Sequence, residues 1–369
     1  MDQTRLSLLA LHFIPGLGDY LIRQLISYCG SAERIFTLPK GKLLKVPGIG
    51  EVTAESIRKG EPFRKAEEEI RLADKNGVQL LFYIDKNYPA RLKQINDAPT
   101  LLYVKGNVNF ENPKTVGIVG TRKATEYGKH CVDDLVEGLV AHDACIISGL
   151  AYGIDIHAHR QALRHKLATI GVMGSGIDVI YPSAHRETAK KMHDHGGLIT
   201  EHPFGTKPDA HNFPARNRIV AGLCDAIIIV EAASKGGALI TADIANSYNK
   251  DVFAYPGNIG QESSEGCNHL IKTNKAFLIT SVKDLEYLMN WNAATPPPMK
   301  VSPLDLSAFT DDEKPVILTL AENKNQLIID ELSWKTGLSI GELATILLNL
   351  ELKGAITSLP GKMYKLRKR

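Results

Sequence analysis

Short glycine-containing turns that follow apolar, β-type runs are the part of this sequence best suited to chemistry. Three of them follow such a run directly, and a fourth comes a few residues after one. Small residues at a helix start leave backbone N–H groups open to phosphate. Because parallel strands end at one edge of a sheet, the turns predict a single anion-binding crevice. The expected contacts are Gly120, Thr121, Arg122, Ser148, Gly149, Gly174, Ser175, Gly176, Gly236 and Gly237.

The cations beside these turns indicate a ligand with several phosphates. Arg122 and Lys123 follow the first glycine, and Arg216 and Arg218 lie in a helical pattern that begins near Phe213. Arginine holds phosphate oxygens through paired hydrogen bonds, and an aromatic ring offers a face to a base. The alternative for the last two arginines is a structural ion pair with a nearby carboxylate. The candidate carboxylates are Glu201, Glu231 and Asp225.

Known nucleotide-binding and catalytic motifs are missing from the turns. The first turn lacks the G-x-G-x-x-G fingerprint, and no G-x-x-x-x-G-K-[ST] loop occurs. Ser148 and Ser175 lack the G-x-S-x-G elbow of a hydrolase. Glu201 and Glu231 remain as an acid–base pair, although each could equally hold an arginine. We therefore expect a binding protein without a cofactor rather than an enzyme.

The segment Asp155–His159 contains two histidines with the H-x-H spacing found in some metal sites. The segment is typical of a helix start, where side chains two positions apart point to different faces. No further cluster of histidines or carboxylates completes a site. We expect no metal here. Asp155 should cap the helix, and His157 and His159 should pack or form hydrogen bonds.

Alternating apolar runs and amphipathic helical patterns, from about Ala66 to Met289, must position the turns. This alternation predicts an α/β, Rossmann-like fold with a mostly parallel sheet that is covered on both faces. Two earlier runs, 79–83 and 101–104, should widen the sheet. The strands expected in the alternating part are 115–119, 144–147, 168–173, 198–200, 226–230 and 251–255.

Two similar turns organise residues 1–62. Ile14–Gly18 and Val46–Gly50 both read hydrophobic-Pro-Gly-hydrophobic-Gly, and helical patterns follow at Asp19–Cys29 and Glu51–Lys59. The pattern resembles the helix-hairpin-helix (SAM-like) module, in which glycines let the backbone approach a phosphate. A small helical bundle without DNA contact is the alternative. We expect the helical fold and leave the DNA contact open.

The last part of the chain predicts a linker and a winged helix. Residues 291–308 have no periodicity and contain three consecutive prolines, which is typical of a stiff linker. Helical patterns and a short hairpin follow in 309–369, the order found in a winged helix. Its third helix carries Glu342 and Glu351, which suit the phosphate-lined groove of duplex DNA poorly. This argues against a transcription regulator that binds duplex DNA through the winged helix. We expect this domain to contact protein or to assist DNA binding weakly.

Composition fits a multidomain protein of the cytoplasm. The chain has 369 residues, of which 44% are hydrophobic, and a net charge of +3, so DNA binding requires locally grouped cations. The five cysteines are scattered without a C-x-x-C pair, which argues against a disulfide framework or a zinc ribbon. No run approaches the roughly 20 apolar residues of a membrane span. We expect no signal peptide and no membrane partner.

Taken in order, the motifs resemble those of the DNA-processing protein A (DprA/Smf) family. The resemblance implies an extended Rossmann-like domain, residues 63–290, that binds single-stranded DNA and forms a homodimer. It also implies that the protein protects incoming DNA and loads the RecA recombinase in natural transformation. The motifs are Gly117–Arg122, Ser148–His159, Gly174–Pro182, Phe213–Ile219, Gly237–Ala242 and Pro256–Gly257.

Carried over residue by residue, the family's site arginine falls on Arg122. Its F-x-x-R-N-R segment falls on Phe213, Arg216, Asn217 and Arg218. The sequence departs from the family in two places, and neither departure removes a positive charge. His185 replaces a usual asparagine, and Gly236–Gly237 replaces a usual Ser-Gly pair.

The alternative function is a nucleotide-processing hydrolase. Enzymes of this kind have a similar phosphate-binding fold with a P-G-G-x-G-T loop. Lys235–Thr241 lacks both the proline and the G-T step of that loop.

Overall fold

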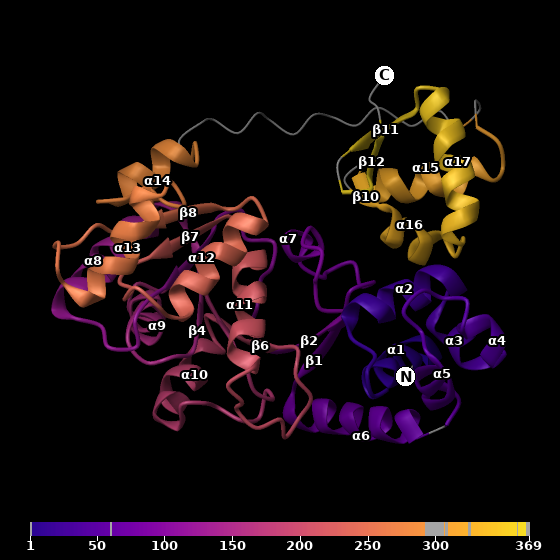
Figure 1. Ribbon diagram of the computed structural model, residues 1–369, viewed down its shortest axis with the longest axis horizontal. Coiled ribbons are helices and arrows are strands. Elements are labelled where there is room, and N and C mark those ends of the chain that lie inside the picture. The colour runs from indigo at the N-terminus through magenta and orange to yellow at the C-terminus, as the bar shows by residue number, and fades with distance from the viewer. Residues whose placement is uncertain are drawn as a thin grey trace. The chain divides into compact units, whose positions relative to one another are not determined.

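The computed structural model describes residues 2–59, 61–291, 306, 309–323, 326–359 and 361–366 (Figure 1). The chain divides into two compact units, one of residues 1–68 and 296–369 and the other of residues 69–295. The expected linker, 291–308, lies outside the described residues apart from Trp291 and Leu306.

A nine-stranded sheet forms the centre of residues 69–295 (Figure 1). The strand order is β1-β2-β6-β5-β4-β3-β7-β8-β9. The strands from β6 to β9 are mutually parallel, whereas β2 is antiparallel to β1 and to β6. The predicted α/β fold with a mostly parallel sheet is confirmed. The strands are β1 (Gln79–Phe82), β2 (Leu101–Gly106), β3 (Thr115–Val119), β4 (Cys145–Gly149), β5 (Thr169–Val172), β6 (Gly196–Thr200), β7 (Ala226–Ile229), β8 (Asp251–Ala254) and β9 (Phe277–Leu278).

The chain builds the sheet outward from β3 in both directions. It first adds β4, β5 and β6 on one side, and then returns to add β7, β8 and β9 on the other. As a result, Val116 of β3 pairs with Ile146 of β4 and with Ala226 of β7. All five residues of β3 are buried, as expected for a strand covered on both faces. A reversal of strand order leaves an open crevice at the carboxyl ends of the strands.

Helices cover both faces of this sheet. On one face, α8 (Glu126–Leu139), α9 (Ile154–Arg164) and α14 (Val282–Leu288) share a hydrophobic core with β3, β4, β7 and β8. Elsewhere, α11 (Asn212–Leu223) packs against α12 (Gly237–Ser247) and against β4. The other helices of this part are α6 (Glu61–Asn76), α7 (Ala90–Lys93), η1 (Val140–His142), η2 (Ser183–His185), α10 (Arg186–Met192) and α13 (Glu262–Lys272).

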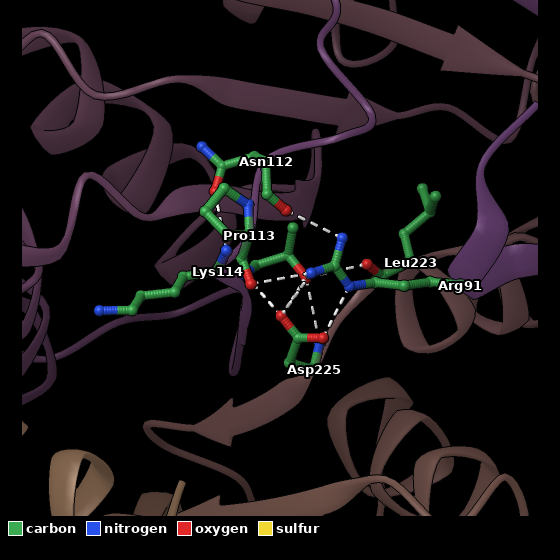
Figure 2. Close-up of polar contacts among 7 residues, drawn as sticks. Arg91, Asn112, Pro113, Lys114, Leu223 and Asp225 are labelled. Atoms are coloured by element: carbon green, nitrogen blue, oxygen red, sulfur yellow. Dashed lines mark hydrogen bonds and ion pairs between the residues drawn. The ribbon is translucent and has the colours of Figure 1, made fainter. Parts of the chain in front are cut away.

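Asp225 joins the amino ends of β3 and β7 and ties α7 to them (Figure 2). Its carboxylate accepts hydrogen bonds from the backbone N–H of Thr115 (2.9 Å) and from its hydroxyl (3.0 Å). Arg91 Nε lies 2.6 Å from Asp225 Oδ1, and the same guanidinium donates to the carbonyl oxygens of Asn112 (2.9 Å) and Pro113 (3.0 Å). This network fixes the register of the two strands at the end opposite to the turns.

Two glycine turns begin the main helices of the N-terminal segment. Gly16 and Gly48 have φ values of +76° and +84°, a conformation that favours glycine. The helices after the turns, α2 (Asp19–Cys29) and α5 (Glu51–Arg58), start where the sequence predicts. The other helices here are α1 (Gln3–His12), α3 (Ala32–Thr37) and α4 (Lys40–Leu43).

The C-terminal segment is a winged helix, as predicted. Its three-stranded sheet has the order β10-β12-β11. Both acidic residues noted on its third helix make structural hydrogen bonds: Glu342 accepts from Ser339, and Glu351 accepts from Ser358. The elements are α15 (Glu313–Glu322), β10 (Gln326–Ile328), α16 (Ile329–Thr336), α17 (Ile340–Leu352), β11 (Ile356–Leu359) and β12 (Met363–Leu366). Within the described residues, no helix has both the length and the apolar character needed to cross a membrane.

Candidate nucleic-acid interface

A crevice of about 760 Å³ lies at the carboxyl ends of β3, β4 and β7. Its lining includes residues from the start of α11 and residues at or after the ends of these strands: Gly120–Arg122, Gly149, Ala151, Ala232, Ala233 and Lys235–Ala238. This is the edge where the parallel strands end, at which the sequence predicts an anion-binding crevice. The predicted site residues brought together here are Gly120, Thr121, Arg122, Gly149, Phe213, Arg216, Asn217, Gly236 and Gly237.

The turn after β5 does not line the crevice, contrary to the expectation that all four turns meet. Ser175 is buried, and its hydroxyl donates to Val179 O (2.7 Å). The N–H of Gly176 donates to Thr206 O (2.9 Å). Gly174 lies beneath the aromatic ring of the site, because a Cβ on it would lie 3.0 Å from Phe213 Cδ1. The turn therefore packs beneath the site, and its hydroxyl and N–H groups form hydrogen bonds within the protein instead of facing the crevice.

Two further predicted residues lie outside the crevice lining. Ser148 is fully buried, and its hydroxyl donates to Ile118 O (2.6 Å) across the neighbouring strand. Lys123 lies in an adjoining hollow that shares Arg122 with the crevice.

Arg218 forms an ion pair with Glu201, and only 14% of each side chain is exposed. The ion pair expected in the structural alternative is therefore present for this arginine. Residues two positions apart on a helix differ by roughly 200° in direction, so Arg216 and Arg218 cannot share one face of α11. The other two candidate carboxylates hold different partners: Asp225 holds Arg91, and Glu231 accepts hydrogen bonds from the N–H (2.9 Å) and hydroxyl (2.7 Å) of Thr125.

Arg216 forms a buried part of the crevice wall. Only 6% of this residue is exposed; its Nη1 donates to Val172 O, and its Nε donates to Asn217 Oδ1 (3.1 Å). A Cβ on Gly149 would lie 2.5 Å from Arg216 Nη2 and 2.6 Å from Asp155 Oδ2. Glycine at position 149 therefore lets the arginine and the carboxylate pack against the strand end.

Asp155 supplies the charge that balances Arg216 in the wall. Burial raises the pKa of the Asp155 carboxyl to about 6, although Arg216 and the backbone N–H groups of Ala151 and Gly120 act in the opposite direction. Burial lowers the pKa of Arg216, and the Asp155 charge opposes that shift. The crevice wall therefore contains a compensated pair, and the uncompensated positive charge lies elsewhere.

The prediction that Asp155 caps its helix is wrong. The N-cap of α9 is Gly153, two residues earlier, and no side chain caps the helix. Gly153 has a φ of +78°, and a Cβ on it would lie 2.2 Å from Thr121 O. The chain thus turns into α9 against the backbone of the β3 turn, where only glycine fits.

The open face of the crevice combines exposed cations with an aromatic pair. The Arg122 side chain is exposed, and its guanidinium carbon lies 5.9 Å from the centre of the Phe213 ring. The Tyr181 ring packs against Phe213 with a centroid separation of 5.8 Å. Lys235 is also exposed and lines the crevice directly before the glycine pair. These groups suit the phosphates and bases of a nucleic acid.

Backbone donors at helix starts complete the site. Gly236 is the N-cap of α12 and Gly153 that of α9, and neither receives a side-chain cap. The first-turn N–H groups of α12 can hold an anion, whereas in α9 the N–H groups of Ile154 and Ile156 donate to Thr121 O and Ala151 O. Asn217 Nδ2 donates to Gly237 O (3.5 Å), which links α11 to the glycine pair.

The crevice lining also includes residues that were not among the predicted contacts, among them Asp155, Tyr181, Asp209 and Lys235. The sequence carries a signal for two of them. Lys235 directly precedes Gly236–Gly237, and Tyr181 follows the Gly174–Gly176 turn by a few residues. Nothing in the sequence indicates that Asp155 pairs with an arginine from a helix distant along the chain.

The two histidines of α9 form hydrogen bonds, as predicted. His159 is fully buried; its Nε2 lies 2.7 Å from Gly149 O and its Nδ1 lies 2.7 Å from Thr169 Oγ1. Burial lowers the pKa of His159 to about 4, so the ring is neutral at neutral pH. His157 Nε2 lies 2.6 Å from Asp133 Oδ1. In the part of the chain that the structure describes, no group of three His, Cys, Asp or Glu residues could hold a metal ion.

Comparison with known proteins identifies relatives along nearly the whole chain. Residues 79–290 match the family model of DNA recombination-mediator protein A, and residues 295–362 match that of the DprA winged helix domain. Protein Smf of Synechocystis is 31% identical over 96% of both chains. Protein Smf of Escherichia coli is 34% identical over 76% of this chain and 75% of its own.

Solved structures give the same match. The chain superimposes on DNA processing protein A of Streptococcus pneumoniae with a TM-score of 0.65 and 33% identity, covering 78% of this chain and 98% of that one. It superimposes on the Helicobacter pylori protein with a TM-score of 0.53 and 30% identity, covering 58% and 96%. The H. pylori structure is described as giving insight into a single-stranded DNA binding mode.

Proposed function

Because the chain belongs to the DprA/Smf family of DNA recombination-mediator proteins, we propose that it binds single-stranded DNA in the crevice beside β3. Its role in DNA processing and recombination follows from the family. The observation that carries the proposal is the arrangement of Arg122 over Phe213 beside the uncapped start of α12. A phosphate would contact the guanidinium and the helix N–H groups, and a base would stack on the ring.

The proposed binding tolerates many sequences and depends on salt. Phosphate contacts and stacking do not distinguish bases strongly, and counterion release makes the affinity fall with salt. Arg122 and Lys235 supply exposed positive charge, whereas Arg216 acts through its pair with Asp155. In this proposal Gly120, Thr121, Gly149, Asn217, Gly236 and Gly237 let the strand approach the backbone closely.

We propose binding without catalysis. The groups that could act as nucleophile, base or acid are held in structural hydrogen bonds. Ser148 donates to a strand carbonyl, and Glu231 accepts a hydrogen bond from Thr125, the N-cap of α8. Glu201 holds Arg218, and His159 is enclosed between Gly149 and Thr169.

We propose that the bound strand is protected and passed to the RecA recombinase in natural transformation, and that the protein works in the cytoplasm. The family description as a recombination mediator supports a handover of this kind. The division into residues 1–62, 63–290, 291–308 and 309–369 is likewise our proposal. In it, the helical and winged-helix segments assist the central domain.

We further propose a homodimer through the Rossmann-like domain. β9 forms one edge of the nine-stranded sheet, and about half of each of its residues is exposed, 49% for Phe277 and 47% for Leu278. Tyr287, in the following helix α14, is 85% exposed. An open apolar edge of this kind is a ready site for pairing with a second copy.

Fluorescence anisotropy with a labelled oligo-dT and its duplex counterpart tests the proposal. The wild-type protein should prefer the single strand, and Arg122→Ala should abolish most of that binding. Lys190→Ala, an exposed lysine on α10 away from the crevice lining, is the matched control and should bind as the wild type does. Equal binding by wild type and Arg122→Ala would contradict the crevice as the site. Absence of DNA binding in both would favour the nucleotide hydrolase instead.

If DNA binding is found, filament assembly of RecA on the same strand tests the handover. The wild-type protein should accelerate assembly in the presence of a single-strand-binding competitor. A protein that binds DNA but leaves the assembly rate unchanged would contradict the RecA proposal alone.

A further inference from the structure

A second hollow of about 400 Å³ adjoins the crevice at Arg122. It lies between the residues that follow β3, the first turns of α8 and α9, and the segment around His185. Arg122 lines both hollows, so the two share one exposed cation. The other cations of the second hollow are Lys123, Lys129 and Arg160.

The charges of this hollow are only partly balanced. Lys129 Nζ lies 2.6 Å from Glu126 Oε1, so this lysine has a carboxylate partner. Arg122, Lys123 and Arg160 are exposed and form no ion pair with any described residue. Three positive charges thus follow one another from the crevice into the second hollow.

The hollow also contains an exposed aromatic ring that is held in place. Tyr152 is 50% exposed, and its ring meets His185 at a centroid distance of 4.8 Å and an interplanar angle of 74°. His185 is itself fixed, because its Nδ1 lies 2.7 Å from Leu150 O and the residue is only 2% exposed. A ring supported from one side and open on the other is suited to stacking on a base.

We propose that the second hollow continues the path of a single DNA strand beyond the crevice. The phosphates pass from Arg122 to Lys123 and Arg160, and a base stacks on Tyr152. This inference rests on the proposed function, since the crevice is taken as the primary site. A polymer explains why two hollows share Arg122 and repeat the same pairing of cation and aromatic ring; a small ligand would fill either one alone.

The length dependence of binding separates the second hollow from the crevice. Oligo-dT of roughly 4 nucleotides occupies one hollow, and oligo-dT of roughly 16 nucleotides reaches both. The test variant is Tyr152→Leu combined with Arg160→Ala. The matched control is Arg164→Ala, an exposed arginine one turn further along α9 that lines neither hollow. Thermal melting should first establish that all of these proteins remain folded.

We expect the double variant to lose affinity for the long strand only. The double variant should bind the 16-mer roughly tenfold or more weakly and the 4-mer as the wild type does. Its salt slope on the 16-mer should fall by about 0.7, the value for one lost phosphate contact on a single strand. Arg164→Ala should change neither affinity.

Three outcomes would overturn the inference. If the double variant binds the 16-mer normally while Arg122→Ala does not, the crevice stands and the second hollow is not part of the path. If Arg164→Ala loses as much affinity as the double variant, the effect is one of overall charge. If neither Arg122→Ala nor the double variant loses affinity for any strand, the proposed function itself fails.

Discussion

The Arg122 guanidinium lies over the Phe213 ring in the crevice, with its carbon 5.9 Å from the ring centre. The arginine follows β3 and the phenylalanine begins α11, so two elements distant in sequence supply one cation–aromatic unit. Tyr181 and Gly174 hold the ring from its other sides. A single nucleotide bound here would contact both members of the unit.

Because the two side chains contact each other and one ligand, their effects on single-strand affinity should not add. Phe213→Leu should cost about 1–3 kcal/mol of binding free energy through lost stacking. Arg122→Ala should cost about 1.5–3 kcal/mol through a lost charge-assisted hydrogen bond. The double variant should lose measurably less than the sum in an oligo-dT titration. If the losses of binding free energy in the two single variants add up in the double variant, the two side chains do not share a nucleotide. Phe213→Tyr, which keeps an aromatic ring, is the control and should retain most of the affinity.

Two glycines of the crevice should respond differently to alanine. A Cβ on Gly149 would lie 2.5 Å from Arg216 Nη2, whereas a Cβ on Gly237 meets nothing within 4 Å. Gly149→Ala should therefore lower the free energy of unfolding by about 1–3 kcal/mol, as overpacking does. Gly237→Ala should leave it unchanged but weaken DNA binding, because the methyl group stands at the start of α12. Urea unfolding and anisotropy, run on both variants, give the comparison.

Arg218→Met should reduce stability rather than DNA affinity. The variant removes the ion-pair partner of the mostly buried Glu201 carboxylate, a change that costs about 3–5 kcal/mol in comparable cases. Combining it with Glu201→Leu should recover much of that loss, since no charge then remains unpaired. Urea unfolding measures both effects. A folded Arg218→Met protein with normal stability and weakened oligo-dT binding would instead favour a direct contact with DNA.

His159 should make stability depend on pH between about 4 and 6.5. Its folded-state pKa of about 4 lies below the ordinary 6.5, so the unfolded chain binds the proton first as the pH falls. The contribution of His159 to the free energy of unfolding, about 3 kcal/mol, is fully present above pH 6.5 and is lost as the pH falls toward 4. Asp155, with its raised pKa, acts in the opposite direction over part of this range. Comparing urea unfolding of wild type and His159→Gln at pH 7 and pH 4.5 isolates the histidine; equal losses in both proteins would contradict the assignment.

Deletion of residues 309–369 should leave single-strand affinity within about tenfold of the full chain. The carboxylates of α17 are bonded within the winged helix, and none of its residues lines the crevice. Anisotropy with oligo-dT compares the two chains, with circular dichroism to check the fold of the shorter one. A larger loss would show that the winged helix contributes directly to the DNA site.

Local patterns predicted the strands and the start of the N-terminal helices, because those features depend on residues close in sequence. β3 matches its predicted bounds, and α2 and α5 begin at the predicted residues. β9 was not predicted, since two residues carry no periodicity. β10 was likewise too short to separate from the helix that follows it.

The candidate site was predicted less completely, because it depends on contacts between distant segments. The sequence places Arg216 and Arg218 in one motif, yet the helix turns one toward Asp155 in the crevice wall and the other toward Glu201. Similarly, the motif Gly174–Gly176 resembles the other turns, but its N–H and hydroxyl groups bind the chain itself. Only the tertiary fold decides which of two similar residues faces the ligand.

The meeting of β3 with β7 also determines when the site can exist. Thr125 and Glu231, whose hydrogen bonds join the segments that follow β3 and β7, lie 106 residues apart in the chain. During synthesis, β3 can pair with β4 early, but its other edge stays open until residues 226–229 emerge. An open central edge is prone to pairing with other chains. The proposed DNA crevice and the protection of β3 therefore arise in the same late step. A chain interrupted before that step would lack the crevice and be prone to aggregate.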